Sequence, residues 1–304
     1  MSTNAGQGRL PDFIVIGAMK GGSTTLWGLL ARHPQIFMCE PKEPQFFSRE
    51  ERFRRGLHAY RELFANAAPG TLAGEASTCY SRWPHYGDVA GRIARALPDA
   101  KLIYQLRHPI DRAHSHYRHL MEERAASGAE GVISFETALA EIPEIVDASR
   151  YRMQLDQYLA HFPRASIHVL TLDDLRKSPA RTWSELQGFL GVEEVAVEAD
   201  VPVDNASGIK FARGEMRRAI RRARALPAWA AVKRIIPQRL RHDLRNWLLR
   251  PEVASRLHRD RLRRHQESVG SLDPDTRKML LAQLDGSTRE FEDWLGRPLP
   301  EWRR

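Results

Sequence analysis

The sequence predicts an α/β fold, built on a central parallel sheet with helices on both faces. Three observations predict this fold class. Five short apolar runs are mostly separated by segments long enough to form helices, an alternation typical of parallel sheets. The first run leads through a glycine-rich loop into a helical pattern, which is the order strand, loop and helix. The 304 residues are 42% hydrophobic, which is enough apolar material for one large domain.

The predicted strands and helices alternate along the chain. The strands are Phe13–Ile16, Ile36–Met38, Leu72–Ala73, Leu102–Leu106 and Ile167–Leu172. The helices are Thr24–Arg32, a segment ending at Arg92–Leu97, Ile110–Glu123, Ser149–Phe162, Pro179–Leu190 and Asp275–Leu295. Pro109 suits the first turn of the third helix, because that position needs no N–H donor. Gly191 and Gly296 follow the last two helices, where glycine commonly ends a helix.

An arginine-rich segment near the C-terminus differs from the rest of the chain. Residues 210–264 hold 18 lysines and arginines but only four acidic residues, whereas the whole chain has a formal net charge of +9. Within Trp229–Leu249, apolar residues recur every three or four positions. This pattern predicts basic amphipathic helices that are interrupted at Pro237 and end before Pro251.

The position of this basic segment gives the expected domain organisation. It lies between the last predicted strand and the final helix, so we interpret residues 205–270 as a basic helical insertion. The core would then comprise residues 11–200 and 271–302. We expect a single domain over residues 1–304.

Cysteine content and the start of the chain bear on cellular location. Two cysteines, Cys39 and Cys79, do not make a disulfide framework, which suits a reducing compartment. The polar start MSTNAGQGRLPD lacks the charged and then apolar layout of a signal peptide. No apolar stretch approaches the roughly 20 residues needed to span a bilayer. These features predict a cytoplasmic protein without a membrane-spanning segment.

The stretch GAMKGGSTTL, residues 17–26, resembles a phosphate-binding loop whose lysine has moved. In the usual pattern, GxxxxGK[ST], a lysine follows the second glycine. Gly17 and Gly22 keep the spacing, but Ser23 stands where that lysine belongs and Lys20 lies inside the loop. Glycines allow backbone N–H groups to point inward, and the next helix adds its positive end. The loop therefore predicts a site for a phosphate-like anion, and an ordinary tight turn is the alternative.

Magnesium-dependent phosphoryl transfer would also need a carboxylate at the end of a neighbouring strand. Asp173 and Asp174 follow the last apolar run and are the pair that fits this position. Helix capping explains the same residues equally well. The displaced lysine and this weak metal pattern disfavour a P-loop kinase or ATPase without excluding it.

A second anion site is predicted where the fourth strand ends. The stretch KLIYQL is followed by Arg107, and Ser115 lies eight residues further on, in the next predicted helix. Ligands of open α/β sheets bind at the carboxyl ends of the strands, where an arginine and a hydroxyl can hold one anion together. The alternative is an arginine that only caps its own sheet edge.

Five stretches, taken in order, resemble the PAPS-dependent sulfotransferases. They are PDFIVIGAMKGGSTTLWGLLARHP, EPKEPQFFS, GEASTCYS, KLIYQLRHPIDRAHSHY and SRYRMQLDQYLAHFPRASIHVLTLDDLRKSPARTWSELQGFLGV. The sequence is similar above all to bacterial members and to the heparan sulfate sulfotransferase branch. The resemblance covers residues 11–192, with a weaker match at 272–302, and is far more specific than any single motif. It implies a P-loop-like fold.

The resemblance implies 3′-phosphoadenosine 5′-phosphosulfate, PAPS, as donor substrate, and it implies no metal. The residues implied for the 5′-phosphosulfate are Lys20, Gly21, Gly22, Ser23, Thr24 and Thr25. Arg107 and Ser115 would hold the 3′-phosphate, a group that ATP lacks. Lys210 and Arg213 fall where the family has a mobile loop over the donor, and they are weaker candidates for donor binding.

The implied chemistry is in-line transfer of a sulfuryl group to an acceptor hydroxyl or amine. Negative charge grows on the leaving phosphate, and Lys20 is the candidate that stabilises it. Glu43 resembles the family's glutamate before a Phe-Phe pair, which implies that it removes the acceptor proton. Glu40 is the alternative base, and a solvated loop acid is the alternative role for Glu43.

Several positions depart from the heparan sulfate branch. Glu75 is followed by Ala76 where a lysine is frequent, which weakens the expectation of a heparan-like acceptor. His108 replaces an aspartate beside the arginine of the 3′-phosphate, so we expect packing or solvent contact for it rather than catalysis. Residues 74–80 contain no histidine, which argues against the mechanism of the cytosolic aryl and steroid members.

The acceptor stays open between a carbohydrate, a lipid and another small molecule. Residues 210–264 could gather an anionic acceptor, contact an anionic membrane peripherally or form only a solvated lid. We expect no nucleic-acid partner. The rival from outside the enzymes is a basic module that binds nucleic acid or membrane and keeps a relic nucleotide site.

Overall fold

The computed structural model describes residues 8–127, 132–196 and 270–304. The chain groups into two compact units. The first unit comprises residues 1–113, 142–203 and 274–304, and the second comprises residues 114–141 and 204–273. The whole described sheet belongs to the first unit.

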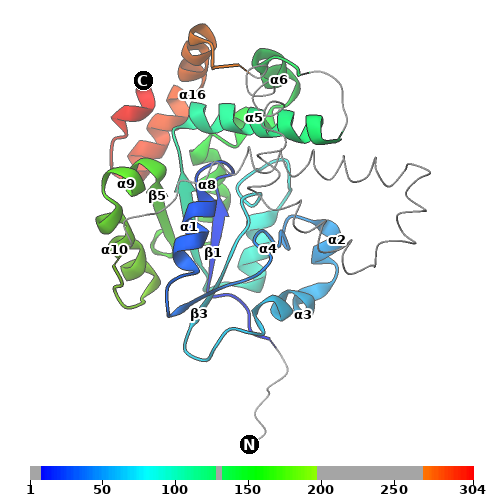
Figure 1. Cartoon of the computed structure of the whole chain (residues 1–304), viewed down its shortest axis with the longest axis vertical. Helices are drawn as coiled ribbons and strands as arrows, with labels where there is room; N and C mark the ends of the chain where they lie inside the picture. The colour runs from blue at the N-terminus through cyan, green and yellow to red at the C-terminus, as the bar shows by residue number, and fades with distance from the viewer. Residues whose placement is uncertain (1–7, 128–131, 197–269) are drawn as a thin grey trace, which may run out of the picture. The chain divides into compact units, whose positions relative to one another are not determined.

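The sheet of the first unit is parallel, with the strand order β2-β3-β1-β4-β5. Figure 1 labels its strands β1, β3 and β5. The strands are β1 (Phe13–Gly17), β2 (Ile36–Met38), β3 (Leu72–Ala76), β4 (Lys101–Leu106) and β5 (Ile167–Thr171). The central strand β1 pairs with β3 on one side and with β4 on the other. The chain therefore reverses its winding direction beside β1, and ligands of such sheets bind outside the carboxyl ends of the strands at this point.

Helices lie between the strands of the first unit and follow the last strand. They are α1 (Ser23–Leu30), α2 (Glu50–Phe53), α3 (Gly56–Arg61), α4 (Val89–Ala96), α7 (Glu144–Asp147), α8 (Tyr151–Leu159), α9 (Leu172–Lys177), α10 (Pro179–Leu190) and α16 (Pro274–Leu295), with 3-10 turns η1 (Glu62–Phe64), η2 (Arg164–Ser166) and η3 (Pro300–Arg303). Helix α5 (Pro109–Ser127) begins in this unit and continues into the second, which also holds α6 (Phe135–Glu141). None of the helices within the described ranges is long and apolar enough to cross a membrane.

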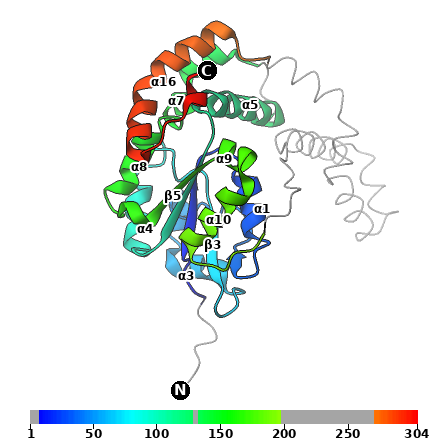
Figure 2. The ribbon, with the colours of Figure 1, turned by 90° about the vertical axis from the view of Figure 1, so that its left-hand side faces the viewer.

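Two apolar layers cover the two faces of the sheet. Because side chains alternate along a strand, Ile14 and Ile16 of β1 join one cluster, while Phe13 and Val15 join the other. The first cluster includes residues of α3, α4, α8 and α16, and the second includes residues of α1 and α10. Figure 2 shows α4 and α8 on one side of the strands and α1 and α10 on the other. Burial on both faces explains why the strands are continuous apolar runs.

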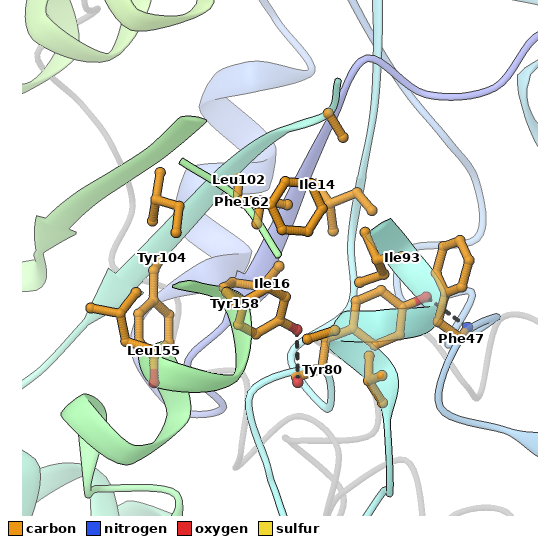
Figure 3. Packing of buried hydrophobic residues seen from close by; sticks show 14 of the residues in the cluster. Ile14, Ile16, Phe47, Tyr80, Ile93, Leu102, Tyr104, Leu155, Tyr158 and Phe162 are labelled. Carbon is orange, nitrogen blue, oxygen red and sulfur yellow. Dashed lines mark hydrogen bonds between the residues drawn. The ribbon is translucent and has the colours of Figure 1, made fainter. Parts of the chain in front are cut away.

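Tyrosines bring hydroxyl groups into the first apolar cluster (Figure 3). The hydroxyl of Tyr158 on α8 donates to the carbonyl oxygen of Tyr80 at 2.9 Å. The hydroxyl of Tyr80 in turn accepts the backbone N–H of Phe47 at 3.2 Å. Phe47 follows β2 and Tyr80 follows β3, so the core itself fastens two loops at the carboxyl end of the sheet.

The sequence predictions for the sheet and the longer helices are confirmed. The five strands lie where predicted, β3 continues to Ala76, and α10 has the predicted bounds. The helices that the sequence did not predict, α2, α3, α6, α7 and α9, have only four to seven residues, too few for an apolar period of 3.6 to repeat. The predicted basic helices of residues 210–264 lie outside the described residues, and the single domain over the whole chain stays a prediction.

We expect alanine substitutions at Gly74 and Gly28 to change stability in opposite directions. A Cβ at Gly74 in β3 would lie 2.1 Å from Cζ of Phe13 in β1, so Gly74→Ala should lower the free energy of unfolding by about 1–3 kcal/mol. A Cβ at Gly28 in α1 would meet nothing within 4 Å, so Gly28→Ala should raise it by up to about 1 kcal/mol. Denaturant unfolding measures both, and an undiminished stability of Gly74→Ala would contradict the close packing of β3 on β1.

Candidate functional site

The glycine-rich loop lies between β1 and α1. Strand β1 ends at Gly17, and helix α1 begins at Ser23. The backbone N–H of Ala18 donates to the carbonyl oxygen of Gln105 at 2.6 Å, which fastens the loop to the end of β4. The loop therefore occupies the carboxyl end of the central strand, at the point where the winding direction reverses.

Two glycines of this loop leave no room for a side chain. A Cβ at Gly21 would lie 2.5 Å from the carbonyl oxygen of Gln105, and a Cβ at Gly22 would lie 2.8 Å from Nε2 of the same residue. Gly22 also has a φ of 101°, a conformation that residues with side chains disfavour. It is the N-cap residue of α1, so no side chain caps the first turn of the helix. A helix end of this kind is suited to bind an anion through its backbone N–H groups.

The side chain of Gln105 lies buried against the loop without a partner. Gln105 is 0% exposed, and neither atom of its amide has a hydrogen bond within the described part of the chain. Buried amides are nearly always hydrogen-bonded in native proteins, because an unmade bond costs about 1–3 kcal/mol. The loop region thus holds an unused donor and acceptor next to its glycines.

Arg112, which the sequence analysis did not single out, also supports the loop. Its guanidinium is fully buried and donates to the carbonyl oxygen of Met19 at 3.5 Å and to Oγ of Ser149 at 2.6 Å. Burial lowers its pKa to about 10, so the group is still charged at neutral pH. The sequence holds no signal for this role, since an arginine in a helix is usually a surface residue.

Lys42 connects the loop with the predicted catalytic base. Lys20 lies inside the loop with a φ of 66°. Lys42 comes from the segment after β2, and its ammonium donates to Oγ1 of Thr24 at 3.0 Å and to Oγ of Ser23 at 3.4 Å. The same nitrogen lies 3.8 Å from Oε1 of Glu43. The sequence analysis missed Lys42, whose only mark was its place beside Glu43.

Glu43 is held through both its backbone and its side chain. Its N–H donates to the carbonyl oxygen of Ala76, the last residue of β3, at 3.1 Å. Its carboxylate accepts a hydrogen bond from Oγ1 of Thr78 at 3.2 Å. The side chain is 33% exposed, so solvent and an acceptor can reach it while its position is fixed. Glu40, the alternative base, is exposed.

Arg107 follows β4 at the same edge of the sheet. Burial lowers the pKa of its guanidinium, which has no hydrogen bond or ion pair with any residue that the structure describes. Asp111, four residues further on, pairs with Arg277 at 3.0 Å. A partly desolvated arginine without a carboxylate partner is suited to bind an anionic ligand.

The structure does not show the other predicted donor-binding residues, Ser115, Lys210 and Arg213, next to Arg107 or the glycine-rich loop. Ser115 lies on α5 within the second unit, so its pairing with Arg107 stays a prediction. Lys210 and Arg213 lie outside the described residues. Thr25 lies in the first turn of α1, where its N–H bonds the carbonyl oxygen of Gly22 at 3.0 Å.

Two further residues considered in the sequence analysis, His108 and Asp174, form hydrogen bonds at the starts of helices. Nδ1 of His108 accepts the N–H of Ile110 at 3.2 Å at the start of α5, a local packing role of the kind expected for it. Asp174 forms a capping box with Thr171 and pairs with Arg297 at 2.8 and 2.9 Å. Burial alone would raise the pKa of Asp174, but the bonds from Arg297 and Thr171 outweigh it and lower that pKa. In the described ranges, no three metal-binding side chains cluster.

A second carboxylate, Glu75 of β3, lies fully buried near Glu43. It accepts hydrogen bonds from the hydroxyls of Tyr60 at 2.6 Å, Ser77 at 2.7 Å and Tyr80 at 3.0 Å. Burial raises its pKa from 4.5 to about 7, and the three hydroxyl donors oppose that rise. The sequence marked Glu75 only as the residue before Ala76.

Fold and site together define a class of protein. It is an α/β domain with a glycine-rich loop after the central strand and, after the next strand, an arginine that is unpaired among the described residues. The model of the sulfotransferase family matches residues 11–196. This match covers more than half of the chain, and the protein belongs to the sulfotransferase family. The matched range includes Lys20, Glu43, Arg107 and Ser115.

Heparan sulfate enzymes are among the relatives of this chain. The chain is 32% identical over 217 residues to bifunctional heparan sulfate N-deacetylase/N-sulfotransferase 1 of Caenorhabditis briggsae, covering 66% of this chain and 25% of the relative. It is 27% identical over 223 residues to human heparan sulfate glucosamine 3-O-sulfotransferase 6, covering 71% of this chain and 64% of the relative. The chain thus spans less than two thirds of the length of these relatives.

A solved structure supports the fold. The crystal structure of a sulfotransferase from Alicyclobacillus acidocaldarius is similar with a TM-score of 0.65 and 23% sequence identity. The match covers 97% of this chain and 100% of that chain. At this identity the likeness shows the fold, and it confirms the predicted P-loop-like sheet flanked by helices.

We expect the buried Glu75 to make the protein less stable as the pH rises from about 4.5 to about 7. Its carboxyl ionises near pH 4.5 in the unfolded chain, whereas burial raises the pKa to about 7 in the fold, so only the folded state keeps the proton in this window. The free energy of unfolding should therefore fall with rising pH, and Glu75→Gln should remove this part of the slope. Denaturant unfolding of both proteins across this pH range measures it, and identical slopes would rule out the effect.

Proposed function

We propose that the protein transfers a sulfuryl group from PAPS to an acceptor hydroxyl or amine. The observation that carries this proposal is that the glycine-rich loop after β1 and Arg107 after β4, each suited to bind an anion, follow neighbouring strands. PAPS is anionic at both its 5′ and its 3′ position, whereas ATP lacks the 3′-phosphate. Two sites therefore suit PAPS better than ATP. Membership of the sulfotransferase family supports the same donor.

The described residues fit such a donor. Gly21 and Gly22 form a cradle that a Cβ would fill, and the buried amide of Gln105 beside them has no partner in the described ranges. The guanidinium of Arg107 is likewise unpaired among these residues. We assign the 5′-phosphosulfate to Lys20, Gly21, Gly22, Ser23, Thr24 and Thr25, the 3′-phosphate to Arg107 and Ser115, and further donor contacts to Lys210 and Arg213.

In the proposed step, the bond between sulfur and the oxygen of the 5′-phosphate breaks as the acceptor oxygen or nitrogen bonds to sulfur. The carboxylate of Glu43 takes the acceptor proton, and the bonding electrons leave with 3′-phosphoadenosine 5′-phosphate. Lys20 and the N–H groups at the start of α1 stabilise the charge that grows on the leaving phosphate. Lys42, bonded to the hydroxyls of Ser23 and Thr24, adds positive charge beside them. The step needs no metal.

Glu43 is the better of the two candidate bases. Lys42 links it to the loop, and Thr78 and Ala76 hold its side chain and backbone. An ordered carboxylate with partial exposure can meet an acceptor from solvent. Glu40 is exposed, and we keep it as the alternative.

The acceptor is proposed as a class only. The names of the relatives specify heparan sulfate, which supports a carbohydrate hydroxyl or amine. Ala76 follows Glu75 where the heparan sulfate branch often has lysine, and the missing cation leaves a lipid or another small molecule open. We also propose a cytoplasmic location and, for residues 210–264, peripheral contact with an anionic membrane.

A P-loop kinase or ATPase is the rival enzyme class. It would use Asp173 or Asp174 at the end of β5 to hold magnesium. The carboxylate of Asp174 is instead engaged by Thr171 and Arg297, which weighs against this alternative.

We expect Lys20→Ala and Glu43→Gln each to lower sulfuryl transfer by roughly 100-fold, through lost stabilisation of the leaving phosphate and lost proton removal respectively. An assay with labelled PAPS over carbohydrate, lipid and phenol acceptors measures the rates. Lys278→Ala and Glu51→Gln, changes of the same kind at exposed positions, are the matched controls and should keep full activity, whereas Glu40→Gln tests the alternative base. Full transfer by Lys20→Ala and Glu43→Gln would overturn the mechanism, and a loss confined to Glu40→Gln would move the base to that residue.

We expect Arg107→Ala to weaken binding of adenosine 3′,5′-bisphosphate by roughly 10- to 100-fold, as one charge-assisted phosphate contact is lost. Binding of AMP, which lacks the 3′-phosphate, should stay nearly unchanged. Calorimetric titration of both nucleotides measures the difference, with the exposed Arg181→Ala on α10 as the control. A wild type that binds AMP as tightly as the bisphosphate would contradict the assignment of Arg107.

A further inference from the structure

One buried carboxyl group of the first unit, that of Glu75, has no part in the proposed step. Glu75 is 0% exposed and accepts hydrogen bonds from Tyr60 and Tyr80, two aromatic residues of the first apolar cluster. Burying a carboxylate is costly unless hydrogen bonds compensate it. Three hydroxyl donors do so here, which indicates a site organised around the carboxylate.

The segment that carries Glu43 runs along the segment after β3 and is bonded to it at every second residue. The N–H of Glu43 donates to the carbonyl oxygen of Ala76 at 3.1 Å. The N–H of Gln45 donates to Oγ of Ser77 at 3.0 Å, and that of Phe47 to the hydroxyl of Tyr80 at 3.2 Å (Figure 3). Two of these three anchors are therefore side-chain hydroxyls and not backbone carbonyls.

Both hydroxyl anchors depend on Glu75. Ser77 accepts from Gln45 and donates to Oε2 of Glu75 at 2.7 Å. Tyr80 accepts from Phe47 and donates to Oε1 of Glu75 at 3.0 Å. A hydroxyl whose proton points at a carboxylate presents its lone pairs to the backbone N–H, so the carboxylate orients both hydroxyls as acceptors.

We propose that Glu75 is a positioning residue, whose buried carboxylate orients Ser77 and Tyr80 so that they hold residues 43–47 and keep Glu43 in place to take the acceptor proton. This inference rests on the proposed function, since it names what fixes the base of that reaction. Glu75 itself touches no reacting atom in this scheme.

The same segment is fastened to the strand that carries the donor loop. The N–H of Ser77 donates to the carbonyl oxygen of Val15 at 3.1 Å, and that of Ser81 to Ile16 at 3.1 Å. Val15 and Ile16 belong to β1, which ends at the loop. Ser77 therefore contacts both the strand that leads to the donor loop and the segment that carries Glu43, and it also bonds Glu75.

The left-handed backbone of this segment shows why it needs such anchors. Glu43 has a φ of 61° and Gln45 a φ of 52°, values that residues with side chains adopt at a cost. Surrounding bonds must hold such a conformation, and the N–H of Gln45 has its bond from Ser77. Loss of the hydroxyl anchors should let the segment relax and displace Glu43.

The test compares buried hydroxyls that differ only in what they accept. Ser77→Ala and Tyr80→Phe each remove one bond to Glu75 together with the acceptor of a backbone N–H. Tyr60→Phe is the matched control, because its hydroxyl also bonds Glu75 but accepts from neither Gln45 nor Phe47 in the structure. Glu75→Gln tests the carboxylate directly, since its amide N–H would face a hydroxyl that now donates.

Hydrogen exchange of the peptide covering residues 43–48 is the first readout and needs no activity. It is measured above pH 7, because the pKa of Glu75 is about 7 in the fold and the group is a carboxylate only above that value. We expect Ser77→Ala, Tyr80→Phe and Glu75→Gln to speed exchange by about fivefold or more, whereas Tyr60→Phe leaves it near the wild-type rate. If Glu75→Gln fails to fold, the exchange rates of Ser77→Ala and Tyr80→Phe still test whether these hydroxyls hold the segment. Unchanged exchange in both of these variants, or equal acceleration by Tyr60→Phe, would overturn the proposal.

Steady-state kinetics with labelled PAPS is the second readout. Ser77→Ala and Tyr80→Phe should lower kcat by roughly three- to tenfold and change the KM for PAPS much less. The base moves with residues 43–47, whereas the glycine-rich loop is also fastened to Gln105 of β4. Faster exchange with an unchanged kcat in these variants would overturn the positioning role. A wild type without transfer activity would refute the proposed function instead, and the exchange experiment would still show whether Glu75 holds the segment.

Discussion

The parallel pairing of β1 with β3 on one side and β4 on the other is the constraint on which the site depends. Because the strands point the same way, their carboxyl ends meet at one edge of the sheet. The glycine-rich loop after β1, the segment after β3 that holds Glu43 and Arg107 after β4 are neighbours for this reason alone. A sheet of mixed direction would send one of these elements to the opposite edge.

Buried polar groups hold the loops that the sheet brings together at its carboxyl edge. Glu75 and Arg112 are both 0% exposed, one with three hydroxyl donors and the other with bonds that reach Met19 of the loop and Ser149. A buried charge tolerates few arrangements, since each unmade hydrogen bond is costly where the dielectric is low. Arg112 in this way holds Met19 of the glycine-rich loop, and we interpret Glu75, acting through Ser77 and Tyr80, as the residue that holds the irregular segment 43–47.

Much of the fold could be predicted from the sequence, and less of the site. The strands were predictable because burial on both faces leaves continuous apolar runs, and α10 because Pro179 and Gly191 mark its two ends. The glycine-rich loop and Arg107 were recognisable because each directly follows a strand. Lys42 and Gln105 were not, since a lysine in a polar loop and a glutamine at a strand end carry no pattern of their own.

The order of strands and helices, the family resemblance and the places of Lys20, Glu43 and Arg107 along the chain could all be predicted without a structure. These features rest on local periodicity and short motifs, which a linear sequence displays. The three-dimensional structure was needed to show that Thr78 holds Glu43 and that Ser77 and Tyr80 join Glu75 to Gln45 and Phe47. Residues about 30 positions apart form these anchors, and they meet because β2 pairs with β3 in the sheet, a pairing that leaves no local mark in the sequence.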